Sequence, residues 1–130
     1  MRVASSVAAL LAALTACGFV HDERIDGPYR LSAIDVDEEM SVCYDLGDAC
    51  VGRIPGTVFA VGSNAAYVVA ARHPANDRSR TEYYYLIREL DGPLVDPSVT
   101  VRGPFDLKAF QAEAERLGLP AFERELSALK

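Results

Sequence analysis

The sequence predicts an α+β domain: a small antiparallel sheet of about four to six strands with one or two C-terminal helices packed on one face. Three observations support this class. Residues 57–90 hold apolar and aromatic runs of strand length, separated by turn-forming residues. From residue 106 onward the apolar residues recur with a helical period. The chain has 130 residues, which is about one domain.

The strongest strand pattern is a β-hairpin. Residues 58–61 and 67–71 are almost wholly apolar, and Gly62, Ser63 and Asn64 between them are turn formers. Because both faces of both strands are apolar, we expect this part of the sheet either to be covered on both sides or to leave one apolar face exposed to solvent.

Four further strand patterns are predicted. Residues 29–34 show a weak alternation of apolar and polar side chains, and residues 40–44 could form a second short strand. Val99 and Val101 suggest a short edge strand. Residues 82–90 predict a strand with Tyr83, Tyr85 and Ile87 on one face and Tyr84 and Leu86 on the other.

The predicted helix begins after Asp106, a good N-cap residue, and ends at Gly118. Its apolar stripe must be buried, so we expect Phe110 to pack against the hairpin or the tyrosine strand. Residues 29–50 then either close the opposite face of the sheet or leave it partly open. A second, shorter helix is predicted from Pro120, with an apolar stripe of Phe122, Leu126 and Leu129.

The N-terminus has the layout of a secretory signal peptide. Arg2 precedes an apolar run at residues 3–14, which is too short for a membrane-spanning helix of roughly 20 residues. Leu14-Thr15-Ala16-Cys17 resembles the lipobox of bacterial lipoprotein precursors. That resemblance implies cleavage before Cys17 and attachment of lipid to Cys17, with an ordinary signal peptide as the alternative.

This interpretation divides the chain into a signal peptide at residues 1–16, a tether at 17–28 and one α+β domain at 29–130. The tether has little apolar pattern and would reach roughly 30–40 Å when extended. The expected location is the bacterial cell envelope. If the organism has two membranes, the outer membrane facing the periplasm is favoured, because Gly18 and Phe19 lack the aspartate that resembles an inner-membrane retention signal.

The charge of the chain excludes one class of partner. The sequence has 13 Lys and Arg against 19 Asp and Glu, and loss of residues 1–16 removes only Arg2 from these. The charges are scattered and no basic stripe exists, so we expect no nucleic-acid binding. The membrane contact would be the N-terminal lipid.

The stretch from about residue 58 to residue 118 resembles a family of small bacterial lipoproteins without an established activity. The resemblance lies in Tyr67-Val68, Tyr84-Tyr85, Gly103-Pro104, Phe110 and Leu117-Gly118. It implies the fold and the envelope location only. The segment between the two later cysteines and the insertion at Asp96-Pro97 are not part of the pattern.

Cys43 and Cys50 form an even pair once Cys17 is assigned to lipid. An exported protein meets an oxidising compartment, so a disulfide is expected. Two free thiols that bind a metal are the alternative, although no second ligand pair accompanies them.

Residues that carry catalysis are scarce, and we expect no enzyme activity and no cofactor. The two histidines, His21 and His73, fall in the tether and at a strand end, and no nucleophile motif or phosphate loop is present. An acidic segment at residues 35–48 could offer oxygens to Ca²⁺ but lacks the regular spacing of a calcium loop; its carboxylates are Asp35, Asp37, Glu38, Glu39, Asp45 and Asp48.

Two function classes remain open. In the first, a lipid-anchored envelope protein acts through protein–protein contact, with Tyr83, Tyr84 and Tyr85 as a possible partner surface if they are not core. In the second, a periplasmic module binds a ligand or metal through the acidic segment. A narrower form of the first class is an inhibitor of an exported hydrolase. Small lipid-anchored lysozyme inhibitors carry a Ser-Gly-x-Lys-Tyr loop, of which residues 63–67 share only the serine and the tyrosine.

Overall fold

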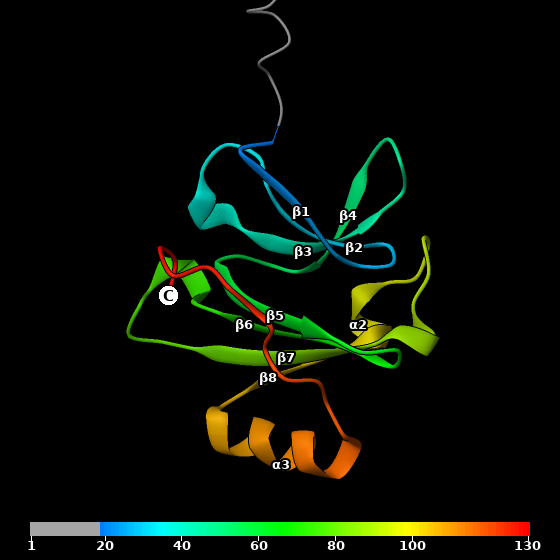
Figure 1. Ribbon diagram of the computed structural model, residues 1–130, viewed down its shortest axis with the longest axis vertical. Coiled ribbons are helices and arrows are strands. Elements are labelled where there is room, and N and C mark those ends of the chain that lie inside the picture. The colour runs from blue at the N-terminus through cyan, green and yellow to red at the C-terminus, as the bar shows by residue number, and fades with distance from the viewer. Residues whose placement is uncertain (1–18) are drawn as a thin grey trace, which may run out of the picture.

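The computed structural model describes residues 19–130. The predictions about the signal peptide and about Cys17 lie outside the described residues. Figure 1 shows three layers, with a four-stranded sheet, a five-stranded sheet and the helix α3 stacked in that order. The coarse α+β prediction is confirmed, but the single predicted sheet is in fact two sheets.

The first sheet is antiparallel, in the order β1-β2-β3-β4. Its strands are β1 (His21–Asp26), β2 (Tyr29–Ala33), β3 (Ser41–Asp45) and β4 (Cys50–Ile54). A 3₁₀ turn at Asp37–Glu39 joins β2 to β3.

The predicted tether is wrong from Val20 onward. The Val20 amide donates to the Ala33 carbonyl over 3.0 Å, and β1 pairs along the whole of β2. The sequence of β1 has no clear strand pattern, because β1 is an edge strand with one face exposed to solvent. Of its six residues, only Ile25 packs against the core.

The second sheet is also antiparallel, in the order β8-β7-β6-β5-β9. Its strands are β5 (Val58–Ser63), β6 (Tyr67–Arg72), β7 (Glu82–Ile87), β8 (Val101–Phe105) and β9 (Arg124–Glu125). The predicted hairpin is β5–β6, and Asn64 closes its turn by accepting from the Ala66 and Tyr67 amides.

The segments around β7 differ from prediction in detail. A 3₁₀ turn at Pro74–Asn76 precedes this strand, which stops at Ile87 because the chain turns into another 3₁₀ turn at Arg88–Leu90. Val99 lies in the short helix α2 (Pro97–Thr100), and the predicted edge strand begins only at Val101.

The helix α3 (Leu107–Leu117) confirms the main helical prediction. The Asp106 carboxylate accepts from the Ala109 amide over 2.8 Å, and Gly118 takes the left-handed conformation at φ 68°. Phe110 is buried, and its ring stacks on Tyr83 with 5.2 Å between centroids.

The second predicted helix does not form. The chain after Pro120 instead lies along the free edge of β5: the Glu123 amide donates to the Val61 carbonyl and the Leu126 amide to the Phe59 carbonyl. An unpaired sheet edge offers these amides better partners than an isolated short helix could. Gly62 permits the approach, because a Cβ there would come within 1.9 Å of the Ala121 carbonyl oxygen.

Two hydrophobic cores follow from the layers. The larger core lies between the sheets and is filled mainly by aliphatic residues of β2 to β7, with Tyr84 and Leu86 pointing into it. The smaller lies between the five-stranded sheet and α3 and is mostly aromatic; its buried members are Val69, Tyr85 and Phe110. The alternation predicted for β7 is therefore confirmed, and the region of residues 29–50 closes the second face of the sheet.

Within residues 19–130, no helix combines the length and the apolar character that a membrane span requires.

Candidate functional site

The tyrosines predicted as a possible partner surface are core residues. Tyr84 and Tyr85 are buried, and Tyr83 is half-buried beneath α3. A partner surface on these tyrosines requires an open face of the five-stranded sheet, but the four-stranded sheet covers one face and α3 covers the other. These tyrosines therefore do not form an exposed partner surface.

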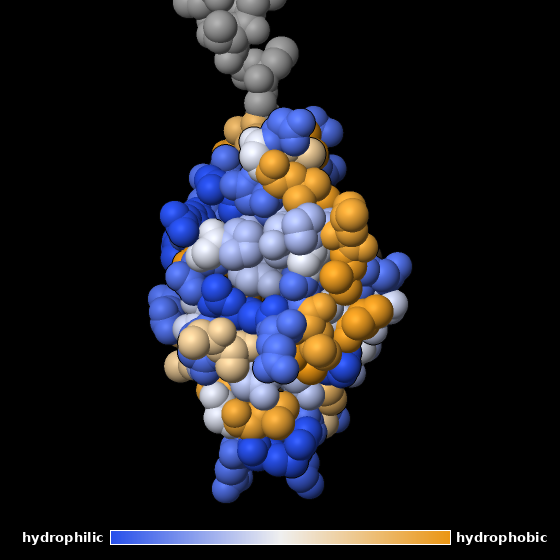
Figure 2. Space-filling view, turned by 90° about the vertical axis from the view of Figure 1, so that its right-hand side faces the viewer, coloured by the Kyte–Doolittle hydropathy of each residue, from blue (hydrophilic) through white to orange (hydrophobic). Residues whose placement is uncertain are grey.

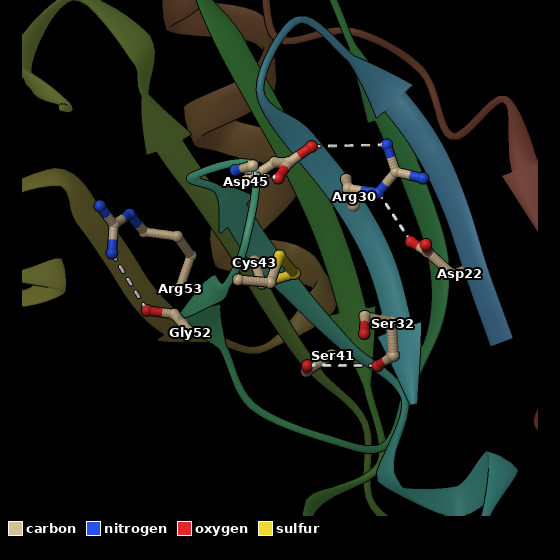
Figure 3. The surroundings of a disulfide bond; sticks show 10 residues. Asp22, Arg30, Ser32, Ser41, Cys43, Asp45, Gly52 and Arg53 are labelled. Carbon is tan, nitrogen blue, oxygen red and sulfur yellow. Dashed lines mark hydrogen bonds and ion pairs between the residues drawn. A yellow bond between two sulfur atoms is a disulfide. The ribbon is translucent and has the colours of Figure 1, made fainter. Parts of the chain in front are cut away.

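The disulfide between Cys43 and Cys50 is present, as predicted. It joins the neighbouring strands β3 and β4, with 5.5 Å between the Cα atoms. It lies on the face of the four-stranded sheet that points away from the large core. On the same face, Figure 3 shows Arg30 between Asp22 and Asp45, with N–O distances of 2.7 and 3.6 Å. The disulfide thus staples an open, polar sheet face.

The acidic segment does not assemble a metal site in the described part of the chain. Asp35, Asp37, Glu38 and Glu39 are all exposed. Across residues 19–130, no three or more His, Cys, Asp or Glu side chains are arranged to hold a metal ion. The acidic segment is therefore a solvated turn. The alternative that Cys43 and Cys50 are free thiols that bind a metal is wrong, because the two cysteines form a disulfide.

The contacts of the two histidines are with neighbouring structural elements. The His73 ring is buried and stacks on Phe59 at 4.4 Å between centroids, while its Nδ1 lies 2.7 Å from the Arg80 carbonyl oxygen. The ring therefore holds the loop that follows β6. His21 lies in β1, with its Nε2 3.1 Å from Glu23.

Sequence reasoning missed a buried ion pair that connects the two halves of the molecule. The side chains of Arg53, in β4, and Asp91, after β7, are both completely buried, and Arg53 Nε donates to Asp91 Oδ2 over 3.0 Å. The Tyr29 hydroxyl donates to the same oxygen over 2.9 Å. No pattern signals this pair, because Arg53 falls in a short weak strand and Asp91-Gly92-Pro93 has the composition of an ordinary turn.

The electrostatics of this cluster favour a neutral tyrosine. Burial, together with the hydrogen bond to Asp91, raises the pKa of Tyr29 well above its usual range. The guanidinium of Arg88 lies 5.3 Å from the centre of the Tyr29 ring, and that of Arg53 lies 5.2 Å from the centre of the Tyr44 ring. The cluster is thus closely packed as well as hydrogen-bonded.

The buried pair fixes an exposed segment, residues 90–99, which we call the Leu94 loop. Arg53 Nη2 donates to the Gly92 carbonyl over 2.8 Å, and the Val95 amide closes a turn on the same carbonyl. At the far end of the loop, the Asp96 carboxylate caps α2 by accepting from the Ser98 amide. Pro93 and Pro97 restrict the backbone further.

The Leu94 loop presents apolar side chains to solvent. Leu94 is 97% exposed, and Leu90 and Val99 are about half exposed. The loop lies on the right-hand side of Figure 1, and Figure 2 shows that this side carries a band of apolar residues beside polar ones. An exposed leucine on a segment held from beneath is suited to contact with another protein.

The loop at residues 63–67, which shares a serine and a tyrosine with the loop of lysozyme inhibitors, packs against the domain. Asn64 Nδ2 donates to the Gly118 carbonyl at the end of α3 over 3.3 Å, and the ring of Tyr67 meets Tyr85 edge-on. The inhibitor hypothesis gains no support from this geometry.

Comparison of the chain with protein-family models, with curated proteins and with solved structures finds no match. The resemblance to small bacterial lipoproteins stays a prediction.

Proposed function

We propose that this chain is a lipid-anchored protein of the bacterial cell envelope that acts by contact with another protein, and that the Leu94 loop is the contact surface. The single observation that carries the contact is Leu94, almost fully exposed on a loop fixed by a buried ion pair. A segment that is already ordered loses little conformational entropy on binding, so a small apolar contact can contribute net affinity.

The anchor part of the proposal rests on the lipobox-like residues 14–17 and on the Cys43–Cys50 disulfide, which fits an oxidising compartment. The alternative, a ligand- or metal-binding module, draws no support from the exposed acidic segment.

Site-specific crosslinking tests the contact. A photoreactive amino acid is placed at Leu94 in the full chain, expressed in its own organism, and envelope fractions are irradiated. Leu107 is the matched control, because it is also an exposed leucine but lies on α3. We expect a crosslinked protein at Leu94 that is absent at Leu107, and loss of that partner from pull-downs with the Leu94→Asp variant. No crosslink at Leu94, or the same crosslinks at both positions, would contradict the proposed contact.

The anchor is tested separately by labelling with a palmitate analogue. The wild-type chain should incorporate the label in the envelope fraction, whereas Cys17→Ser should incorporate none and remain unprocessed or soluble. Unlabelled wild-type protein in the cytoplasm would overturn this part of the proposal.

A further inference from the structure

The structure leaves almost no tether between Cys17 and the folded domain. Val20 is already hydrogen-bonded to Ala33, and β1 begins at His21. The three residue steps from Cys17 to Val20 reach at most about 10 Å when fully extended. If Cys17 carries lipid, as proposed above, the surface around Val20 must therefore lie at the membrane.

That surface is apolar. Phe19, Val20, Ile34 and Val36, which we call the anchor-end patch, each expose about half of their area. Register places Ile34 next to Val20, because it follows Ala33, the partner of His21. Phe19 and Ile34 line the same hollow of about 130 Å³. In Figure 1 the start of β1 and the loop after β2 lie at the same end of the molecule.

The charge around the patch indicates which kind of bilayer it fits. Residues 33–50 contain no Lys or Arg, and the exposed Asp35, Asp37, Glu38 and Glu39 lie beside Val36. Arg30 lines a hollow with Phe19, but its guanidinium is paired with Asp22 and Asp45. Anionic headgroups would be repelled by these carboxylates, whereas zwitterionic headgroups would not. The apolar contact alone is small, but a lipid at Cys17 gives it a high effective concentration of membrane.

We propose that the anchor-end patch rests on a zwitterionic lipid surface, with its apolar side chains among the headgroups beside the lipid on Cys17. This inference rests on the proposed lipid anchor. It implies that the domain has a fixed orientation on the membrane, with α3 at the end away from the bilayer, because Figure 1 places α3 opposite β1.

Tryptophan fluorescence tests this orientation, because the chain contains no tryptophan of its own. Ile34→Trp is the probe and Leu107→Trp, on α3, is the control; both replace exposed residues, and circular dichroism checks that both variants are folded. Each full chain is purified from membranes in its lipidated form and reconstituted into phosphatidylcholine vesicles with brominated acyl chains.

We expect the emission of Ile34→Trp to shift to shorter wavelength and to be mostly quenched by the brominated lipid, while Leu107→Trp is unchanged. Replacing phosphatidylcholine by phosphatidylglycerol should weaken the quenching, and added salt should restore it. Equal quenching of both probes, or none of Ile34→Trp, would overturn the inference. A shift of Ile34→Trp caused by an envelope protein but not by lipid would assign the patch to a protein and overturn it as well.

Mass spectrometry of the N-terminal peptide separates the two proposals. Absence of lipid on Cys17 would overturn the proposed anchor together with this inference. Lipid on Cys17 without quenching of Ile34→Trp would overturn this inference alone.

Discussion

The two sheets of this domain differ in how many of their faces are covered. The five-stranded sheet has the four-stranded sheet on one face and α3 on the other, and its central strands β5 and β6 are apolar in almost every position. The four-stranded sheet buries one face only, and its open face carries Asp22, Arg30, Asp45 and the disulfide. The fully covered sheet forms the scaffold of the domain, whereas the half-covered sheet leaves one face exposed, where it can contact solvent or a neighbouring surface.

The largest effect should come from placing a charge in the core that the two sheets share. Tyr84→Arg buries a second guanidinium beside Arg72, whose Nη1 lies 3.4 Å from the Tyr84 hydroxyl. The nearby carboxylate, Glu82, accepts from the Tyr84 hydroxyl over 2.9 Å and already pairs with Arg72, so two guanidinium groups would have to share it. The expected cost is several kcal/mol, comparable with the whole stability of a small domain. The matched control is Tyr83→Arg in the half-open helix core, where the longer side chain can reach solvent and about 1–3 kcal/mol is expected.

Urea unfolding followed by circular dichroism measures both variants. Loss of the folded state for Tyr84→Arg and retention for Tyr83→Arg would support the difference between the two cores. Equal unfolding of both variants would show that the helix side is as tightly closed as the side between the sheets.

The next effect concerns the link between the sheets. Asp91→Ala leaves the fully buried Arg53 without its carboxylate, and we expect a loss of about 3–5 kcal/mol. Asp48→Ala, on an exposed turn, serves as the control and should be nearly neutral. Because Asp91 holds the Leu94 loop, crosslinking from Leu94 should also weaken in Asp91→Ala under conditions where the variant is still folded. An unfolding midpoint equal to that of wild type would show that the pair does not hold the sheets together.

The disulfide tests the open sheet by itself. Replacing Cys43 and Cys50 by Ser should cost about 2–3 kcal/mol, the chain-entropy value for so short a loop. The loss should be seen first as faster hydrogen exchange in β3 and β4, with the five-stranded sheet unaffected under native conditions. Alkylation of both thiols in wild-type protein without reductant would contradict the bond itself.

The smallest expected effect is a decrease in the stability of the fold at alkaline pH, caused by tyrosines in both hydrophobic cores. Burial is the main cause that raises the pKa of Tyr29, Tyr84 and Tyr85 in the folded protein. In the unfolded chain tyrosine ionises near pH 10. These groups therefore stabilise the fold below about pH 10, and this contribution is lost as the pH rises further.

The midpoint of urea unfolding should accordingly hold steady up to about pH 9 and decline above about pH 10. Tyr29→Phe should make the decline shallower, because one of the three groups is removed. A midpoint that does not change at high pH would show that these tyrosines are not protonated preferentially in the folded state.

The difference between the sheets also explains what the sequence could predict. The hairpin β5–β6, the faces of β7 and the capped helix α3 were predicted because each has a strong apolar period or a local cap signal. Strand β1 was missed because a half-exposed edge strand buries little more than Ile25, so its residues resemble a linker. The segment after Pro120 has helical spacing but pairs with β5, since a free sheet edge outside the local sequence decides its conformation.

The candidate site was harder to predict than the fold. The tyrosines were correctly placed on two faces of β7, but whether a face is covered depends on the four-stranded sheet, which the local pattern of β7 cannot reveal. The Arg53–Asp91 pair joins residues 38 positions apart, and only the tertiary fold brings them together. Leu94 carried no signal either, because a single leucine between two prolines gives no period.

The domain begins at Val20, so a lipid on Cys17, as proposed, would hold its open sheet directly beside the membrane. Hydrogen exchange of the β1 amides in the lipidated protein measures this most directly. We expect the amides of β1 that are paired with β2 to exchange slowly, at rates close to those of β2 itself. Free exchange throughout residues 20–26, with β2 still protected, would show that these residues are a flexible tether and not part of the folded domain.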